Sequence, residues 1–136
     1  MFRIAIDGPA GSGKSSISKI LCKKLNFEHI DTGAMYRAIT LKALQLGINL
    51  ENEDEYDFLE STKLDIQKDK IFMDGIDVST DIRSVEVTTN ASTPAKLGRV
   101  RTFLVDMQRE LAGTRNVIMD GRDIGTVVLP NAELKI

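Results

Sequence analysis

The chain has 136 residues, of which 42% are hydrophobic and 28% charged, so it can hold one compact domain, or a core with a small insert, but not two full domains. Its 18 lysines and arginines against 20 aspartates and glutamates leave a net charge of -2, which argues against nucleic acid or an anionic membrane surface as a partner. The single cysteine excludes an internal disulfide framework, and the lack of a secretory stretch or a long apolar run predicts a cytoplasmic protein that acts on small molecules.

The first predicted element is a strand at residues 2–6, which leads into the sequence GPAGSGKS at residues 8–15. Glycines there allow left-handed backbone conformations and bring N–H groups around an anion, and the N-terminus of the following helix adds partial positive charge. Lys14 is expected to reach the β- and γ-phosphates of a nucleoside triphosphate, and the Ser15 hydroxyl to ligate its magnesium ion. We predict a phosphate-binding loop made of Gly8, Pro9, Ala10, Gly11, Ser12, Gly13, Lys14, Ser15 and Ser16.

A helix is predicted over residues 14–25, because Ile17, Ile20, Leu21 and Leu25 recur at helical spacing and indicate its buried face. Cys22 lies in this helix, where it fits packing better than redox chemistry. The helix would connect two parallel strands as a right-handed crossover, with the second strand at residues 27–30.

Asp31, Thr32 and Gly33 follow that second strand, and a helix is predicted after them over about residues 34–46. Its inward positions are expected to be Met35, Ile39 and Leu46, and Gly47 is expected to end it.

The middle of the chain predicts a small antiparallel sheet inserted in an α/β protein. A capping box over residues 52–55 predicts a short acidic helix with Tyr56, Phe58 and Leu59 on its apolar side. Residues 63–78 then follow an extended pattern, in which Asp74 and Gly75 predict a two-residue hairpin turn.

Helical character returns at Thr93 and Pro94, which predict an N-cap and a first helical position. The apolar stripe of this helix is expected to end before Gly113 and consists of Val100, Phe103, Leu104, Met107 and Leu111. Residues 116–120 predict a buried parallel strand, which Gly121, Arg122 and Asp123 interrupt.

The last residues predict the start of another strand at 134–136, after an apolar stretch at 126–129 and a turn at Pro130 and Asn131. A parallel sheet that stops on an unfinished strand leaves unpaired backbone, so we expect the chain to be part of a longer protein.

A phosphate-binding loop alone does not distinguish kinases, GTPases, ATPases and nucleotide-binding regulators. Arg37 and Arg122 each follow a turn at the carboxyl edge of a predicted strand, where bound phosphates are expected, so we assign both to phosphate binding. Arg83 and Arg99 fit solvated surface charges better.

Three stretches together resemble the bacterial cytidylate kinases. They are IAIDGPAGSGKSS at residues 4–16, DTGAMYR at 31–37 and DGRDIGTVV at 120–128. The first is shared by many families, whereas the other two together are specific, and the resemblance covers the whole chain in the same order.

The resemblance implies an α/β P-loop nucleoside monophosphate kinase fold, in which helices flank a parallel sheet and a small three-stranded antiparallel insert is added. It divides the chain into a P-loop core at residues 1–37 and 94–136, incomplete at its C-terminus, and a nucleoside-monophosphate-binding region at 38–93. The implied reaction transfers the γ-phosphate of ATP, with Mg2+, to CMP or dCMP, and the implied enzyme is a monomer.

The resemblance also implies roles for individual residues. A nucleoside monophosphate has a second pKa of about 6, so it is mostly dianionic at neutral pH and needs no general base. Lys14, Arg37 and Arg122 are the implied catalytic residues, because two anions must be brought together and the charge of the transferred group stabilised. The implied substrate-binding residues are Thr32, Arg37, Ser92, Arg101, Asp120, Arg122 and Asp123.

The resemblance implies that Asp123 is the first candidate for base selection, and a carboxylate suits this role because cytosine carries an amino donor where uracil has an acceptor. Ser92 and Arg101 are expected to read the rest of the base edge. For Asp120 two roles stay open, one in the same pocket and one in the water shell of the metal.

The family continues beyond this point with an arginine-bearing lid, so we expect the chain as given to bind nucleotide but to transfer phosphate poorly. One alternative is a related kinase for UMP, another nucleotide or an alcohol. Only an alcohol acceptor would need a carboxylate base, and Asp31 or Asp123 would then serve as that base. The other alternative is a nucleotide-binding module without catalysis.

Overall fold

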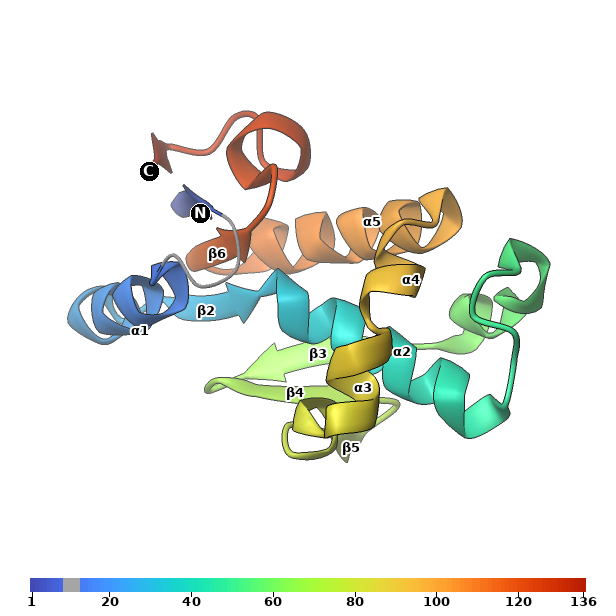
Figure 1. Cartoon of the computed structure of the whole chain (residues 1–136). Helices are drawn as coiled ribbons and strands as arrows, with labels where there is room; N and C mark the ends of the chain where they lie inside the picture. The colour runs from blue at the N-terminus through green and yellow to red at the C-terminus, as the bar shows by residue number, and fades with distance from the viewer. Residues whose placement is uncertain (9–12) are drawn as a thin grey trace. The chain divides into compact units, whose positions relative to one another are not determined.

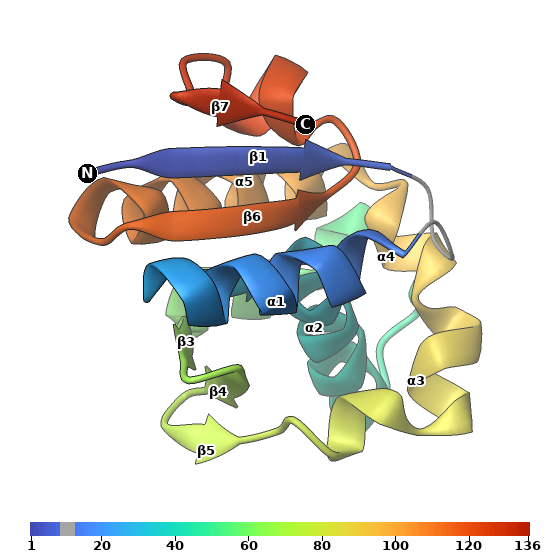
Figure 2. The same ribbon diagram turned by 90° about the vertical axis from the view of Figure 1, so that its left-hand side faces the viewer.

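The main sheet contains four parallel strands in the order β2-β6-β1-β7 (Figures 1 and 2). They are β1 (Arg3–Asp7), β2 (Glu28–Asp31), β6 (Val117–Gly121) and β7 (Leu134–Lys135). β1 pairs with β6 along its whole length and with β7 at its centre. The predicted parallel sheet is confirmed, including the strand that begins at the end of the chain.

The computed structural model describes residues 1–8 and 13–136, which fall into two units. We call Met1–Thr32, Ile66–Asp69 and Met107–Ile136 the sheet unit, and Gly33–Asp65 with Lys70–Asp106 the helical unit. Within the described part of the chain, no helix is both long and apolar enough to cross a lipid bilayer.

The core of the sheet unit joins β1 and β6 to the helix α1 (Lys14–Leu25). Ile4 and Ile6 of β1 and Ile118 of β6 pack with Cys22 of α1. Burial raises the pKa of the Cys22 thiol to about 12, which agrees with a packing role.

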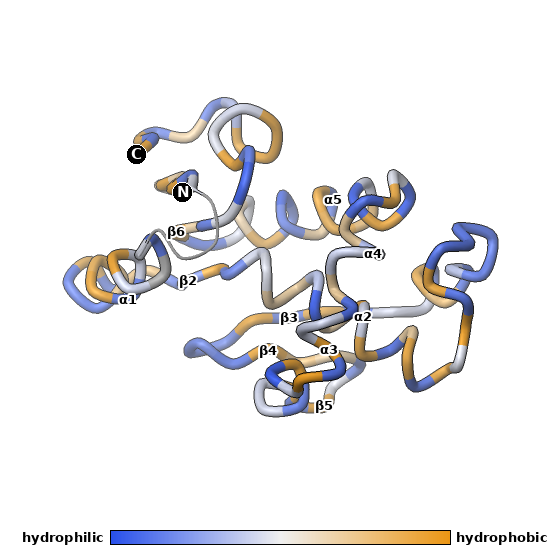
Figure 3. The backbone as a smooth tube through the Cα atoms, in the orientation of Figure 1, coloured by the Kyte–Doolittle hydropathy of each residue, from blue (hydrophilic) through white to orange (hydrophobic). Residues whose placement is uncertain are grey.

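The bounds of α1 are confirmed, but three of the four residues of its predicted buried face are exposed, and only Leu21 packs against the core. Hydrophobic positions recur along α1 (Figure 3), but Ile17, Ile20 and Leu25 are 51%, 57% and 46% exposed. The buried positions are Ser18 and Cys22, and the Ser18 hydroxyl donates to the Lys14 carbonyl oxygen at 2.8 Å. A serine that bonds inside its own helix can be buried, and hydrophobic spacing does not reveal this.

The helix α2 (Thr32–Leu46), which belongs to the helical unit from Gly33 onward, ends as predicted at Gly47, which has φ 68°. Met35 and Ile39 are buried, but the inward prediction for Leu46 is wrong, because it is 54% exposed. The predicted acidic helix is instead two 3-10 turns, η1 (Glu53–Glu55) and η2 (Asp57–Ser61).

The small sheet has the order β3-β4-β5, from β3 (Leu64–Gln67), β4 (Lys70–Met73) and β5 (Ile76–Asp77). The predicted turn between β4 and β5 is confirmed, with φ 53° at Asp74 and 84° at Gly75. The turn between β3 and β4 also has positive φ at both of its residues, Lys68 and Asp69.

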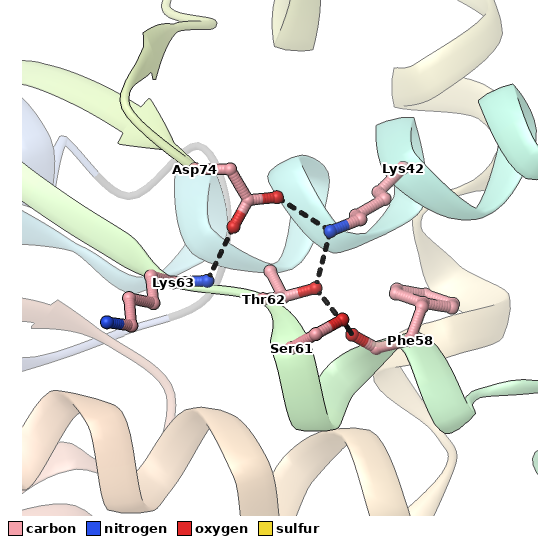
Figure 4. Close-up of polar contacts among 6 residues, drawn as sticks. All are labelled: Lys42, Phe58, Ser61, Thr62, Lys63 and Asp74. Carbon is pink, nitrogen blue, oxygen red and sulfur yellow. Dashed lines mark hydrogen bonds and ion pairs between the residues drawn. The ribbon is translucent and has the colours of Figure 1, made fainter.

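Lys42 of α2 holds the Asp74 turn in place (Figure 4). Its Nζ donates to Asp74 Oδ2 at 2.6 Å and to Thr62 Oγ1 at 2.8 Å, while Asp74 Oδ1 accepts from the Lys63 N–H at 2.9 Å. The hydrogen bond from Lys42 is the main cause of the lowered pKa of Asp74. One lysine therefore fixes the turn of the insert on α2.

The segment predicted as one helix from Thr93 is divided. After η3 (Asp81–Arg83), the helices are α3 (Val85–Asn90), α4 (Ser92–Ala95) and α5 (Gly98–Thr114). The apolar stripe is expected to end before Gly113, and α5 itself continues through Gly113 to Thr114. Val100, Leu104 and Leu111 of the predicted stripe are buried.

Arg99 is not only a solvated charge. Its Nη2 pairs with Asp57 Oδ1 at 2.7 Å, and its Nη1 donates to the Glu53 carbonyl oxygen at 2.8 Å. It therefore joins α5 to the two 3-10 turns. Arg83 is exposed, as predicted.

Candidate functional site

Three sequence motifs end at the same edge of the main sheet. In the register of the strands, Asp7 lies beside Gly121, and Asp31 lies beside Asp120. The Gly8 N–H donates to the Gly121 carbonyl oxygen at 3.1 Å. The start of the phosphate-loop motif is thus bonded directly to the motif that follows β6, at the carboxyl edge where open α/β sheets bind ligands.

The described ends of the predicted phosphate-binding loop have the expected local structure. Gly13 has φ 82°, a left-handed conformation that favours glycine, and α1 begins immediately after it at Lys14. The first turn of α1 carries no acidic residue, so its N-terminal N–H groups and partial positive charge are not offset. Pro9, Ala10, Gly11 and Ser12 lie outside the described residues, as does the side chain of Ser15.

The segment after β6 turns sharply at Asp123 and continues as a π-helical turn over Ile124–Val128. Asp123 has φ 58°, a left-handed conformation that aspartate adopts more readily than most other residues with a side chain. Arg122 and Asp123 are both exposed, and neither side chain has a partner among the described residues. Both charges are thus presented beside the end of the phosphate-loop strand.

Asp7 holds this turn in place, a role that the sequence analysis did not assign. Its Oδ1 accepts from the Ile124 N–H at 2.5 Å, and its Oδ2 accepts from the Gly125 N–H at 3.0 Å. The contacts span 117 and 118 residues of sequence, so no local pattern pointed to them. Asp7 thereby acts as an anchor for the loop that carries Arg122 and Asp123.

We expect Asp7→Ala to destabilise the chain by about 1–3 kcal/mol, because two hydrogen bonds to a charged group are lost. Thermal or urea unfolding measures the change, with Asp106→Ala, an exposed aspartate of α5, as the matched control. Equal stability of the two variants would show that the loop does not depend on Asp7.

Thr32 and Asp120 are buried at the same edge. Thr32 is the first residue of α2, and its hydroxyl donates to the Asp120 carbonyl oxygen at 2.9 Å. Asp120 Oδ2 lies 2.7 Å from His29 Nε2, while its Oδ1 is buried and has no hydrogen-bond partner among the described residues. A buried carboxylate oxygen without a donor is costly, which fits a site completed by a ligand or by metal-bound water.

The other predicted substrate-binding residues belong to the helical unit. Arg37 is half-buried on α2, and Ser92 and Arg101 are exposed on α4 and α5. Burial raises the pKa of the Tyr36 phenol, while a hydrogen bond and the charge of Arg101 lower it. Tyr36 therefore helps to hold Arg101 against α2, a contact that the sequence analysis missed.

The predicted site residues thus divide between the two units. The sheet unit contains Lys14, Thr32, Asp120, Arg122 and Asp123, and the helical unit contains the other three. Among the described residues, no group of three or more histidine, cysteine, aspartate or glutamate side chains could hold a metal ion.

Comparison with known proteins gives consistent results. A family model described as "Cytidylate kinase" matches residues 4–136. The chain is 52% identical over 134 residues to the cytidylate kinase of Fusobacterium nucleatum, covering 98% of this chain and 62% of the relative. It is 53% identical over 135 residues to that of Acholeplasma laidlawii, covering 99% and 61%. It is 54% identical over 138 residues to that of Desulforamulus reducens, covering 97% and 61%. The chain therefore spans about three fifths of the length of these curated relatives.

Proposed function

This chain belongs to the cytidylate kinase family, and we propose that the protein transfers the γ-phosphate of ATP to CMP or dCMP, giving CDP or dCDP and ADP. The observation that carries the proposal is the hydrogen bond from the Gly8 N–H to the Gly121 carbonyl oxygen. It joins the motif that would bind the donor phosphates to the motif that would bind the acceptor. A two-substrate phosphotransferase needs this proximity.

In this proposal, residues of the phosphate loop hold the donor. The backbone from Gly8 to Ser16 surrounds the phosphates of ATP, Lys14 contacts the β- and γ-phosphates, and Ser15 ligates Mg2+. The bound metal ion neutralises charge that develops on the transferred phosphoryl group. No acidic residue lies in the first turn of α1 to oppose the anion.

Arg37 and Arg122 would hold the acceptor phosphate, with the Thr32 hydroxyl nearby. Guanidinium groups suit this role because they bind phosphate through two parallel hydrogen bonds and remain charged at all relevant pH values. The acceptor phosphate is a dianion at neutral pH, so the residues need to position and neutralise it rather than remove a proton. Removing either arginine would therefore weaken acceptor binding and slow the transfer.

The base would be read by Asp123, Ser92 and Arg101. A carboxylate accepts a hydrogen bond from the 4-amino group of cytosine and repels the carbonyl oxygen of uracil at the same place. Support comes from the left-handed conformation of Asp123 and from the contact of Arg101 with Tyr36. Residues 38–93 would form the acceptor-binding region and residues 1–37 with 94–136 the P-loop core. We also propose that the enzyme works as a monomer in the cytoplasm.

Acceptor comparison tests the proposed reaction. The natural gene product is assayed for ADP release with CMP, dCMP, UMP and AMP at equal concentrations, and CMP binding is measured by calorimetry. We expect transfer to CMP and dCMP to exceed transfer to UMP and AMP by at least about 10-fold. A preference for UMP or AMP would support a related kinase, and a complete lack of CMP binding would support a module without catalysis.

We expect Asp123→Asn to reduce the preference for CMP over UMP by about 10-fold, because an amide can offer either a donor or an acceptor to the base. Asparagine also tolerates the left-handed backbone at this position, so the fold is retained. The ratio of kcat/KM for CMP and UMP measures the effect. Asp81→Asn, an exposed aspartate of η3, is the matched control, and an unchanged ratio in Asp123→Asn would assign base selection to another residue.

A further inference from the structure

His29 is the only histidine of the chain, and it is buried on β2 with 5% of its surface exposed. Its backbone pairs with Ile118 of β6, so its side chain lies on the same face of the sheet as Asp120, two residues further along. The contact from His29 Nε2 to Asp120 Oδ2 is 2.7 Å long. None of the roles proposed above uses this histidine.

Both ring nitrogens of His29 face carboxylates. Nδ1 lies 3.4 Å from Oδ1 of Asp69, which belongs to the turn between β3 and β4. A neutral imidazole carries one N–H, so its second nitrogen would present a lone pair to a carboxylate. The arrangement favours the doubly protonated ring, which donates a hydrogen bond to Asp120 and pairs its charge with Asp69.

The charges around His29 agree with this geometry. Burial alone would lower the pKa of His29, but the hydrogen bond and charge of Asp120, with the charges of Asp31 and Asp69, outweigh it and raise the pKa. Its protonated form is therefore stabilised in the fold, and this contribution is full below the unfolded-state pKa of about 6.5 and is lost as the pH rises through the higher folded-state pKa.

The contact determines what Asp120 can offer to a ligand. Asp120 is 1% exposed, and with Oδ2 occupied by His29 the carboxylate cannot turn without losing that hydrogen bond. Its Oδ1 is buried and has no donor among the described residues. One oxygen is therefore used for fixing the group, and the other is left as an acceptor at the carboxyl edge of β6.

We propose that His29 is a positioning residue, which holds Asp120 so that its Oδ1 accepts a hydrogen bond from the bound nucleotide complex. The inference rests on the proposed function and deepens it, because it says that Asp120 accepts a hydrogen bond from a donor group of the bound ligand. That donor belongs either to the acceptor nucleotide or to water bound to the metal of the triphosphate. Asp69 is the outer partner and acts only through the ring.

Two substitutions of His29 separate positioning from packing. His29→Leu fills the space without any donor, whereas His29→Gln keeps an amide donor that can reach Asp120. We expect His29→Leu to lower kcat/KM of the natural gene product by about 10- to 100-fold, the range seen when outer-shell partners of ligating groups are removed. We expect His29→Gln to recover most of this loss. Asp106→Asn, at an exposed position of α5, is the matched control and should change kcat/KM less than about 2-fold.

Kinetic constants identify the donor. If the donor belongs to CMP, His29→Leu should raise KM for CMP. If the donor is metal-bound water, His29→Leu should lower kcat and raise the magnesium concentration that the reaction requires. Either result supports the proposal. Equal kinetics of His29→Leu and wild type, or a loss in His29→Gln as large as in His29→Leu, would overturn it.

Nitrogen NMR of the wild-type chain provides a test that does not depend on catalysis or on the folding of a variant. With a single histidine, the ring signals need no assignment. We expect both ring nitrogens to be protonated at pH 7, and their signals to shift when CMP or Mg-ATP is added, since the other oxygen of Asp120 gains a donor. Binding of both nucleotides without any shift would overturn the proposal, whereas an absence of CMP binding and of transfer in the wild type would instead refute the proposed function.

Discussion

Replacing Gly121 with alanine is expected to destabilise the chain by at least about 3 kcal/mol. A Cβ atom at this position would lie 2.0 Å from Thr32 Oγ1, and 3.2 Å from both Thr32 Cβ and Ile124 Cδ1. Gly121 also has φ 156°, a conformation that residues with a side chain rarely adopt. The new methyl group therefore has no space, and the backbone cannot accept it without strain.

The neighbours of Gly121 cannot move away easily. Thr32 is buried, and its hydroxyl donates to the Asp120 carbonyl oxygen at 2.9 Å. A shift of Thr32 would break this bond and move the start of α2, while a shift of β6 would disturb Asp120. We therefore expect loss of CMP binding together with the loss of stability.

Urea unfolding of the chain measures this effect, with Gly113→Ala as the matched control. Gly113 is exposed near the end of α5, and nothing lies within 4 Å of a Cβ built there. Its replacement by alanine should stabilise the helix by about 0.5–1 kcal/mol, so the two substitutions differ in sign. A second substitution, Thr32→Ala, removes the closest atom and should restore part of the stability of Gly121→Ala. Wild-type stability of Gly121→Ala would contradict the close packing of this edge.

The features that the sequence predicted well have local causes. The left-handed Gly13 before α1, the hairpin turn at Asp74 and Gly75 and the helix end at Gly47 each follow from which residues tolerate positive φ. The short apolar runs of β1 and β6 predicted buried parallel strands, because such a strand needs apolar residues on both faces. Local conformational preference is therefore sufficient to place these elements.

The features that the sequence did not predict depend on contacts between distant segments. His29 meets Asp120 across 91 residues, and Asp7 meets Ile124 across 117, so both contacts exist only because β6 lies between β2 and β1 in the sheet. Spacing along α1 indicated an apolar face of four residues, but the strands pack against Cys22 and Leu21, while Ile17, Ile20 and Leu25 are exposed. Hydrophobic periodicity shows that a helix is amphipathic, and only the tertiary fold decides which of its positions are covered.

The same distinction explains the two classes of site residue. The phosphate-loop residues form one contiguous motif whose chemistry is readable from spacing. Asp7 and His29 act by holding other residues, and their sequence neighbours give no sign of this. The sequence thus predicted the residues that would contact the ligand. The roles of Asp7 and His29 follow only from the order of the strands in the sheet.

Replacing Lys14 with methionine is expected to lower kcat of the natural gene product by about 100- to 1000-fold, the range for loss of one preorganised electrostatic group at a reacting centre. Lys14 is the first residue of α1, and its carbonyl oxygen accepts a hydrogen bond from the buried Ser18 hydroxyl at 2.8 Å, so its backbone position is fixed. Methionine keeps the apolar stem of the side chain and a high helix propensity, so the fold should be retained. The substitution should impair the use of ATP and leave KM for CMP little changed, because Lys14 is assigned to the donor phosphates.

Lys19→Met, at an exposed position of the same helix, is the matched control and should leave both kcat and KM for CMP unchanged. A kcat that stays at the wild-type value in Lys14→Met, or falls equally in Lys19→Met, would show that the loop before α1 does not bind the phosphates that are transferred.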